Sequence, residues 1–370
     1  MRYLQLEECC EILDSLRIPI TASDRKAGPY PYYGANGIQD YVADYIFDDE
    51  LVLLVEDGGN FGSKTRPIAY RASGKFWVNN HAHVLKPKRN IVDVDYLCYS
   101  LMFYNTEELV NGATRQKLTQ AAMRKMLIPE QPIQVQKKIV AELKTIQAII
   151  SARQQQLQKL DELVKARFVE LFGDPLSNDK GWQKVLITEV CHAIFGGGTP
   201  SKSHPEYFTG SIPWVSPKDM KSLVINDSID HITEEAIAHS TTNLVPANSV
   251  LMVIRSGILK HTLPVAVNSL PVTINQDMKA FVPNDTVKTA FLMYFFKAIE
   301  NDVLAGIRGV TADNIDFKAF QKRTIIVPPL ALQEQFAAFV TQTDKSKVAV
   351  QKALDEAQLL FDSLMQKYFG

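Results

Sequence analysis

The sequence predicts an α/β protein: two mixed α/β domains and two long α-helices, which pair with each other along an apolar seam. Three observations support this fold class. Two stretches of about forty residues match without a gap at a constant offset of 197 residues, from Gln136 and Gln333 to Phe172 and Phe369. Both stretches have helical periodicity, and the segments before them match each other more loosely. A repeat of this length indicates a duplicated architecture.

The repeat divides the 370 residues into four parts. We expect a first domain at 1–131, a first long helix at 132–173, a second domain at 174–328 and a second long helix at 329–370. The segment 174–181 is rich in turn-forming residues and separates the first helix from the second domain.

Short apolar and β-branched segments alternate with Gly, Pro and Asn turns in both domains, and helical segments lie among them. This mixture predicts α/β domains. Strand-like segments that correspond between the domains are 51–55 with 250–254 and 76–81 with 272–277, and helices are expected at 94–104 and 287–301.

Each long helix has an apolar seam with heptad spacing that lasts more than three heptads. Neither helix contains an internal Pro or Gly. Pro132 and Pro329 precede the helices, and Gly173 and Gly370 follow them, as helix ends favour. The seam positions are Ile139, Leu143, Ile146, Ile150, Arg153, Leu157, Leu160 and Val164 in the first helix, and Phe336, Val340, Thr343, Lys347, Val350, Leu354, Ala357 and Phe361 in the second.

A seam of this length needs a partner, and the other copy of the helix is the obvious one. The alternative is that each helix packs separately on its own domain. Arg153, Thr343 and Lys347 interrupt the apolar seams with polar groups. Such interruptions cost stability but can fix register and orientation.

Composition excludes several classes of protein. Lys and Arg total 40 against 41 Asp and Glu, so the net charge of −1 gives no general attraction to polyanions and a nucleic-acid site must come from local patches. The four cysteines have neither metal-ligand spacing nor a disulfide pattern, which favours a reducing, cytoplasmic compartment. We see no signal peptide and no apolar run long enough to span a membrane.

Motifs for catalysis and cofactors are missing. Residues 58–65 resemble a phosphate-binding loop, but Ser63 separates Gly62 from Lys64, so no nucleotide site is predicted. His81 and His83 would share one face of a strand without an apparent third ligand, so no metal site is predicted. The Asn/Asp-Pro-Pro-Tyr/Phe tetrapeptide of adenine methyltransferases, a serine nucleophile elbow and a His-Glu-x-x-His motif are absent. We therefore predict a binding protein without a cofactor, not an enzyme.

Basic residues gather near the starts of both long helices. A solvated face is the alternative to a nucleic-acid contact, and recurrence beside both helices makes the two interpretations about equal. The residues are Arg115, Lys117, Arg124, Lys125, Lys137 and Lys138 in the first copy and Lys318, Lys322 and Arg323 in the second, and Lys86, Lys88 and Arg89 form a third basic cluster.

These features together resemble the specificity (S) subunit of type I restriction-modification systems, over essentially the whole chain. Pro-x-x-x-Gln opens both long helices, and Phe-Gly closes them. Further matching motifs are Tyr-Tyr-Gly-Ala-Asn-Gly at 32–37, Asn-Asn-His-Ala-His-Val at 79–84, Gly-Thr-Pro-Ser at 198–201 and Ile-Pro-Trp-Val at 212–215.

The resemblance implies that each domain is a target-recognition domain that binds one half of a bipartite, asymmetric site in double-stranded DNA. The helices pair as an antiparallel coiled coil with an approximate twofold, and this pair is a spacer that sets the unread gap. Two modification (M) subunits, which carry S-adenosylmethionine, dock on this frame and methylate one adenine in each half-site at N6. Restriction (R) subunits are further potential partners, and the S subunit itself is not catalytic.

Candidate DNA contacts are of two kinds. Amide side chains can make paired hydrogen bonds to adenine, and basic side chains can bind phosphate or guanine. Turn residues whose amides bond backbone are the alternative for the first kind. The amides are Asn79, Asn80, Asn275 and Gln276, and the basic residues are Lys64, Arg66, Arg115, Lys117, Lys202, Arg255 and Arg308.

Two other functions would use the same architecture. A coiled-coil adaptor would bind proteins through its two domains and would not recognise DNA half-sites. A DNA methyltransferase or nuclease that acts alone would need the catalytic motifs that are missing here.

Overall fold

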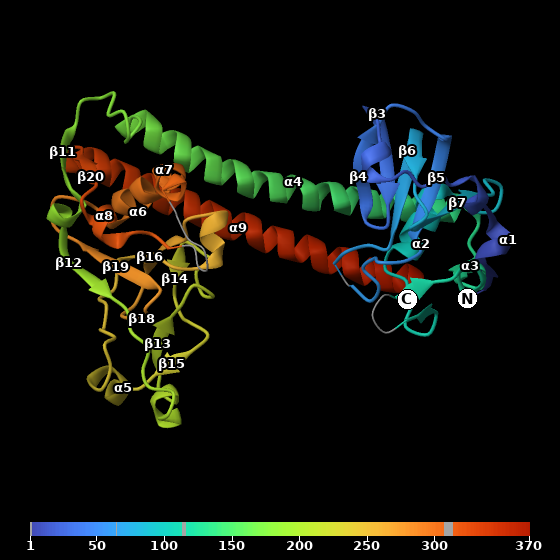
Figure 1. Cartoon of the computed structure of the whole chain (residues 1–370). Helices are drawn as coiled ribbons and strands as arrows, with labels where there is room; N and C mark the ends of the chain where they lie inside the picture. The colour runs from blue at the N-terminus through green and yellow to red at the C-terminus, as the bar shows by residue number, and fades with distance from the viewer. Residues whose placement is uncertain (1, 64, 113–115, 307–313) are drawn as a thin grey trace. The chain divides into compact units, whose positions relative to one another are not determined.

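The computed structural model of the chain describes residues 2–63, 65–112, 116–306 and 314–370, and these divide into two compact units. Unit 1 is Met1–Gln154 with Lys352–Gly370, and unit 2 is Gln155–Gln351. Each unit therefore consists of one mixed α/β domain and one half of each long helix. The predicted fold class, two α/β domains with two long antiparallel helices, is confirmed (Figure 1).

Unit 1 is built on a six-stranded sheet with the order β2-β7-β5-β6-β3-β4. Neighbouring strands are antiparallel except β6 and β3, which run parallel. The central strand β5 is buried on both faces along 51–55, as its uninterrupted apolar run predicts. The strands are β2 (Cys10–Ile12), β3 (Ala27–Gly34), β4 (Gly37–Val42), β5 (Phe47–Val55), β6 (Ala69–Val78) and β7 (Ala82–Pro87).

The rest of unit 1 surrounds this sheet. Helix α2 (Val94–Met102) packs on β5 and β6, and the Asp93 side chain caps its first turn. Its further elements are β1 (Tyr3–Gln5) paired with β10 (Leu127–Pro129), β8 (Val110–Asn111) paired with β9 (Lys117–Leu118), helices α1 (Leu6–Cys9) and α3 (Gln120–Arg124), and the 3-10 turns η1 (Asp14–Leu16) and η2 (Ala22–Asp24).

Unit 2 has a five-stranded sheet with the order β12-β19-β16-β17-β14 and a three-stranded sheet with the order β15-β13-β18. The strands are β11 (Gln183–Leu186), β12 (Cys191–Gly196), β13 (Ile212–Val215), β14 (Val224–Ile225), β15 (His231–Ile232), β16 (Val250–Val253), β17 (Val265–Asn268), β18 (Thr273–Ile274), β19 (Met278–Pro283) and β20 (Thr324–Val327), which pairs with β11. The helices are α5 (Glu234–Ala238), α6 (Thr289–Ala298), α7 (Glu300–Ala305) and α8 (Phe317–Gln321), with 3-10 turns η3 (Ile187–Val190), η4 (Pro205–Phe208) and η5 (Gly257–Lys260).

The two domains repeat the same order of strands. The order β2-β7-β5-β6 in unit 1 corresponds to β12-β19-β16-β17 in unit 2, and the parallel pair β3 and β6 corresponds to β13 and β18. The single strand β6 is replaced in unit 2 by β17 and β18, with Pro271 between them. Proline cannot donate a hydrogen bond to a neighbouring strand, so it interrupts the strand there.

The long helices are α4 (Ile133–Phe172) and α9 (Leu330–Phe369), 40 residues each. The Pro132 carbonyl accepts hydrogen bonds at the start of α4, and Gly173 ends it with a left-handed φ of 75°. Every predicted seam position is buried or half-buried. The helices run antiparallel: Tyr368 donates to Glu142 at 2.7 Å in unit 1, and Lys347 pairs with Asp161 at 2.7 Å in unit 2. The alternative of separately packed helices is therefore wrong.

The polar seam residues have different partners. Lys347 extends to Asp161 on the opposite helix, so it joins the two helices in unit 2. The Thr343 hydroxyl instead donates to the Phe339 carbonyl of its own helix at 2.9 Å. Lys347 is thus a candidate orientation device, whereas Thr343 satisfies its polar group locally.

A buried glutamine near the start of each long helix bonds to the preceding domain. The Gln136 side chain accepts from the Asp93 N–H at 2.8 Å, and Gln333 accepts from the Lys288 N–H at 2.8 Å. These N–H groups belong to the residues just before α2 and α6. Each glutamine also donates to two backbone carbonyls, those of Ile91 and Gln131 for Gln136 and those of Thr286 and Pro328 for Gln333.

Both long helices contribute to the core of each unit. In unit 2, Phe172 at the end of α4 packs edge-on to Phe291 of α6, with ring centroids 4.9 Å apart. In unit 1, Phe369 at the end of α9 packs on Tyr96 of α2 at 5.2 Å. Helix α6 packs against β16, β17 and β19 (Figure 1). Among the described residues, no helix combines the length and the hydropathy that crossing a bilayer requires.

Candidate functional site

Three of the predicted DNA contacts, Lys64, Arg115 and Arg308, lie outside the described residues. The others fall into three groups: residues of a turn that occurs in both domains, residues around a groove in unit 2, and basic residues of unit 1.

The turn that follows β6 in unit 1 and β18 in unit 2 is the same in both domains. The Asn79 side-chain oxygen accepts from the His81 N–H at 2.8 Å, and the Asn275 oxygen accepts from the Asp277 N–H at 3.0 Å. Both asparagines are buried, at 4% and 7% exposure. Their oxygens therefore form the turn, and a contact with adenine would cost these bonds.

The middle residue of each turn points outward. Asn80 and Gln276 are both exposed. The Thr199 hydroxyl donates to the side-chain oxygen of Gln276, which leaves the Gln276 amide nitrogen as the group directed to a ligand. Of the four predicted amides, these two are the ones placed to contact DNA.

Unit 2 has an open groove of about 700 Å³ beside this turn. Its apolar part is formed by Phe208 and Trp214, whose rings are 5.8 Å apart. The Trp214 indole is fixed by a 3.0 Å hydrogen bond to the Gly198 carbonyl. Its polar part contains Lys202, Lys218, Asp230, Ser216, Ser256, Asn275 and Asp277. An aromatic floor with lysines around it is a suitable surface for a nucleic acid.

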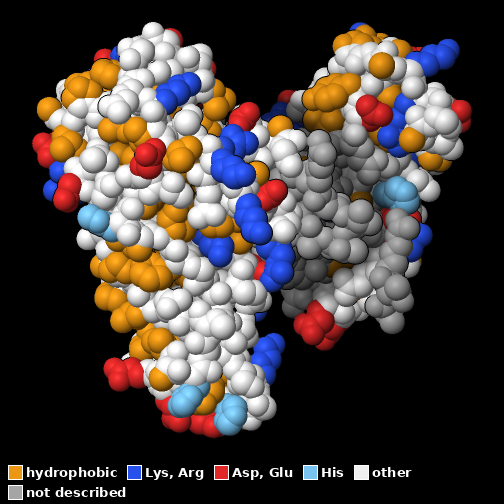
Figure 2. Space-filling model, turned by 60° about the vertical axis from the view of Figure 1, so that its left-hand side comes forward, with side chains coloured by type: hydrophobic (Ala, Val, Ile, Leu, Met, Phe, Trp, Pro, Cys, Tyr) orange, Lys and Arg blue, Asp and Glu red, His pale blue; other side chains and the backbone are white. Residues whose placement is uncertain are grey.

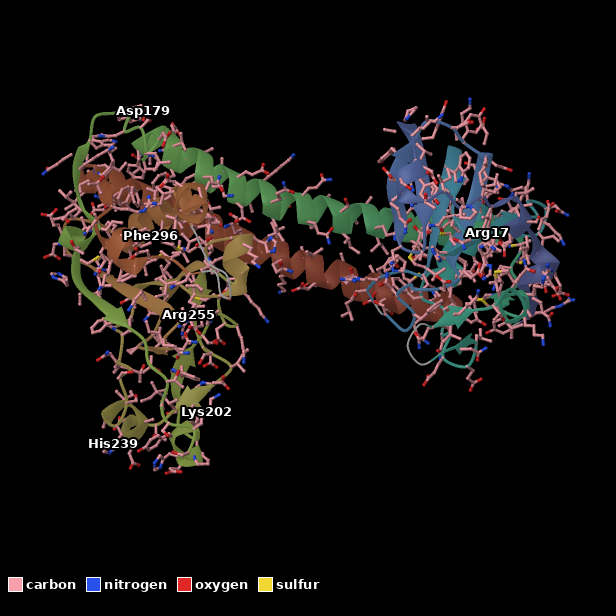
Figure 3. The ribbon with its side chains drawn as sticks, in the orientation of Figure 1. Arg17, Asp179, Lys202, His239, Arg255 and Phe296 are labelled. Atoms are coloured by element: carbon pink, nitrogen blue, oxygen red, sulfur yellow. The ribbon has the colours of Figure 1, made fainter. Side chains whose placement is uncertain are left out.

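Arg255, at the end of β16, lies next to this groove. Its Nε and Nη2 are both 2.5 Å from Oδ1 of Asp277, which lines the groove. Figure 3 labels Arg255 and Lys202 on the same unit, with Lys202 nearer the tip that carries α5. One face of this unit carries a row of Lys and Arg side chains, while acidic side chains gather at the tip (Figure 2). The fold thus brings the predicted residues Lys202, Arg255, Asn275 and Gln276 together.

The corresponding position in unit 1 has opposite charge. Asp57 corresponds to Arg255, because the Glu56 N–H donates to the His81 carbonyl as the Ile254 N–H donates to the Asp277 carbonyl. Glu56, the residue before Asp57, binds Arg17 at 2.6 Å and Lys117 at 3.0 Å. Lys117, a predicted DNA contact, is therefore engaged within the domain. The third residue of the unit 1 turn, His81, bonds to Asp57 at 2.7 Å. The same backbone frame consequently presents a guanidinium in unit 2 and an imidazole–carboxylate pair in unit 1.

A buried network in unit 1 extends from Glu56 to His83. The His83 ring lies 2.7 Å from the Asp14 carboxylate and 2.9 Å from the Leu118 carbonyl, and both partners are acceptors. Both ring nitrogens of His83 therefore face acceptor oxygens. Burial alone would raise the pKa of Asp14, but the bond and charge of His83, with the Val84 N–H and Arg17, hold that pKa below its usual value.

The side chains of Asp14, Glu56 and His83 lie within 4.8 Å of one another, which is a possible arrangement of metal ligands. Arg17 already supplies a cation there through its bonds to Glu56 and to the Ala82 carbonyl at 2.8 Å. Burial would raise the pKa of Glu56, yet its bonds to Arg17 and Lys117 lower it overall. The carboxylate oxygens and ring nitrogens that could bind a metal already bond to protein groups, so these residues do not fit a metal site.

The remaining basic residues of unit 1 differ in availability. Arg66 is exposed in the loop after β5. Lys86 pairs with Asp49 at 2.7 Å and Arg89 with Glu50 at 3.2 Å, so the acidic segment 40–57 neutralises this cluster. Arg66 is thus the described basic residue of unit 1 that we keep as a candidate.

Gly197 and Tyr32, which lie beside and within recognised motifs, have structural explanations. A Cβ at Gly197 would lie 1.7 Å from the Asn275 carbonyl oxygen, so glycine allows a close backbone approach within the domain. Tyr32 is 1% exposed, with its hydroxyl bonded to the backbone of Ile20, so it belongs to the core.

Sequence reasoning missed Asp277, Trp214 and Lys218 as members of the site. Asp277 aligns with His81, and Trp214 is part of the Ile-Pro-Trp-Val motif, but neither residue type by itself indicates a groove. A groove depends on which loops meet in space, and the sequence does not give that.

Comparisons with known proteins agree with this architecture. The S subunit of the type I restriction-modification system from M. genitalium has the same fold, with a TM-score of 0.62 at 13% identity over 100% of this chain and 96% of that one. A second structure, described as bearing on complex assembly and conformational transition of the type I R-M system, matches with a TM-score of 0.58 at 18% identity, over 100% of this chain and 97% of the other. The protein therefore belongs to a class whose fold has two similar α/β domains joined by two paired long helices.

Sequence comparison defines the family. A putative type I restriction enzyme specificity subunit, S.HindORF215P of Haemophilus influenzae, is 27% identical over 96% of this chain and 92% of its own. The EcoR124I/EcoR124II specificity subunit of Escherichia coli is 40% identical over 153 residues, which are 40% of this chain and only 38% of that protein. The model "Type I restriction modification DNA specificity domain" matches residues 1–162 and 179–357. The chain belongs to this family of specificity subunits, the non-catalytic components that confer DNA target-sequence specificity, as the resemblance predicted.

Proposed function

We propose that this chain recognises a bipartite, asymmetric site in double-stranded DNA, with unit 1 and unit 2 each binding one half-site. The observation that carries the proposal is the repeated turn. An asparagine oxygen accepts from the same backbone N–H in both domains, yet the turn and the strand end beside it present Asn80, His81 and Asp57 in unit 1 and Gln276, Asp277 and Arg255 in unit 2. Different groups on equivalent positions would select different bases, so the two half-sites should differ.

In this proposal α4 and α9 form a spacer between the half-sites. Their antiparallel pairing supports two like partners, the M subunits, each of which would methylate one adenine at N6. R subunits would join the same complex for cleavage, and the complex would act in the cytoplasm. The proposed DNA contacts are the exposed residues Arg66, Asn80, Lys202, Arg255 and Gln276. Lys64, Arg115 and Arg308 remain proposed contacts.

The spacer is tested by changing its length. Removing one heptad from each helix, residues 150–156 and 354–360, keeps the seam in phase because a seam residue replaces a seam residue at each junction. At about 1.5 Å per residue this shortens the pair by about 10 Å, or at most about three base pairs. The wild-type chain and the deletant are expressed with their M subunits in a host without adenine methylation, and the modified sites are sequenced.

We expect a shorter unread gap between two unchanged half-sites. A matched variant with one heptad inserted in each helix should lengthen the gap. An unchanged gap in both variants, or altered half-site sequences, would contradict the role of the helices as a spacer.

A further inference from the structure

The guanidinium of Arg255 is held on one edge by a carboxylate that is itself held in place. Nε and Nη2 of Arg255 are both 2.5 Å from Oδ1 of Asp277. The other oxygen of Asp277 accepts from the Asn275 amide at 3.3 Å, and the Asp277 N–H donates to the Asn275 oxygen. The buried Asn275 thus orients Asp277, which in turn orients Arg255.

This arrangement decides which N–H groups of Arg255 remain for a ligand. A guanidinium has five N–H groups in one plane, and Asp277 occupies the edge formed by Nε and one proton of Nη2. One proton on Nη1 and one on Nη2 then point forward, parallel to each other. Two parallel donors match O6 and N7 of guanine in the major groove, which are adjacent acceptors.

Arg255 differs from the lysines of the groove because its charge is neutralised by an ion pair. Arg255 with Asp277 has no net charge, so the pair contributes little to the sequence-independent attraction of phosphates. Lys202 and Lys218 are exposed, and among the described residues neither has an ion-pair or hydrogen-bond partner. The Arg255–Asp277 pair has oriented donors and no net charge, so it is suited to contact a base. Lys202 and Lys218 keep their charge, so they are suited to contact the phosphate backbone.

The equivalent position of unit 1 lacks this chemistry. Asp57 stands there, and its carboxylate lies 2.7 Å from Nδ1 of His81. A carboxylate accepts hydrogen bonds and cannot donate to guanine. A contact with guanine from this position is therefore available to unit 2 alone.

We propose that Arg255, positioned by Asp277, selects one guanine in the half-site bound by unit 2, while Lys202 and Lys218 bind phosphates beside it. This inference rests on the proposed function, because it names one base contact within that recognition. It predicts that one G·C pair of one half-site depends on Arg255 and that no position depends on Lys202.

The first experiment uses the full chain with its M subunits in a host without adenine methylation. Sites modified by the wild-type complex define both half-sites. Arg255→Ala should make one G·C position of one half-site degenerate and leave the other half-site intact, which also shows that the complex still folds. The double variant Arg255→Ala/Asp277→Asn should give the same relaxed site without an unpaired carboxylate. Lys202→Ala should leave the recognised sequence unchanged.

The second experiment measures binding of the purified complex to the duplex so defined, with guanine or 7-deazaguanine at that position. Loss of N7 removes one of the two acceptors, so it should weaken wild-type binding by less than the about 5- to 150-fold that a whole paired contact discriminates, and it should not change binding by Arg255→Ala. Lys202→Ala should instead lower the slope of log affinity against log salt by about one.

The outcomes distinguish the two proposals. The guanine contact is overturned if the Arg255→Ala complex still requires every G·C position of both half-sites. It is also overturned if wild type and variant discriminate equally against 7-deazaguanine. Either result would leave the proposed function standing. A wild-type complex that modifies no defined site would overturn the proposed function itself, and this inference with it.

Discussion

Replacing Gln333 with alanine should loosen the second domain from the helix that follows it. The side chain is fully buried and makes three hydrogen bonds, with the Lys288 N–H at 2.8 Å, the Pro328 carbonyl at 2.8 Å and the Thr286 carbonyl at 3.1 Å. At about 1 kcal/mol per bond the substitution costs about 3 kcal/mol, and more where the backbone groups stay buried without a partner. This is a large part of the stability of one domain, typically about 5–15 kcal/mol.

Hydrogen exchange measured by mass spectrometry on the full chain locates the effect. Gln333→Ala should speed exchange at the start of α6, whose first turn follows Lys288, and leave α2 unchanged. Gln136→Ala should do the reverse, because Gln136 holds the residue before α2. Gln335→Ala is the matched control, since Gln335 is exposed near the start of the same helix. Equal exchange in Gln333→Ala and Gln335→Ala would refute the reasoning.

A charged variant makes the test sharper. In Gln333→Glu one carboxylate oxygen would face the Thr286 and Pro328 carbonyls without a donor, and burial would raise its pKa in the folded chain. The destabilisation by the buried carboxylate is absent below the ordinary pKa of glutamate, about 4.3, where the side chain is protonated in both the folded and the unfolded chain. It grows as pH rises through the raised folded pKa. The deficit of Gln333→Glu relative to wild type should therefore increase with pH, whereas that of Gln333→Ala should not.

The remaining predictions concern charges. Lys347 and Asp161 should couple by less than about 1 kcal/mol in a double-mutant cycle of urea unfolding, because Asp161 is 56% exposed. Lys347→Leu should stabilise the seam and not destabilise it, and a lower urea midpoint would contradict this. The lowered pKa values of Asp14 and Glu56 give unit 1 stability that is present above their unfolded pKa values, about 4, and lost as pH falls through the lower folded values. Asp14→Asn should flatten this loss when hydrogen exchange of β7 is followed between about pH 6 and pH 2.5, and an unchanged profile would argue against the network.

Sequence reasoning was accurate for features that depend on neighbours along the chain. The heptad spacing predicted the seam of α4 and α9, because burial on a helix follows its own period. The alignment of 76–81 with 272–277 correctly paired two turns. It could not show that the side-chain oxygens of Asn79 and Asn275 form those turns, since an asparagine that builds a turn and one that contacts a base look the same in sequence.

The charged residues show where sequence reasoning ends. Lys117 and Arg255 are equally plausible DNA contacts in the sequence. In the structure Lys117 pairs with Glu56, whereas Asp277 holds Arg255 at the edge of a groove. Lys86 and Arg89 formed a basic cluster in sequence and are neutralised by Asp49 and Glu50. The availability of a charge depends on partners that are distant in the chain.

The sequence alone therefore determined the duplication, the paired helices and the family, because these follow from periodicity and from motifs that repeat in order. The tertiary structure decided which groups each domain exposes. Arg255 meets Asp277 only because β16 and β19 lie side by side, and Glu56 meets Arg17 and Lys117 only because three separate segments converge at the end of β5. Hydrogen bonds and ion pairs act over a few ångströms, so they are set by packing and not by position along the chain.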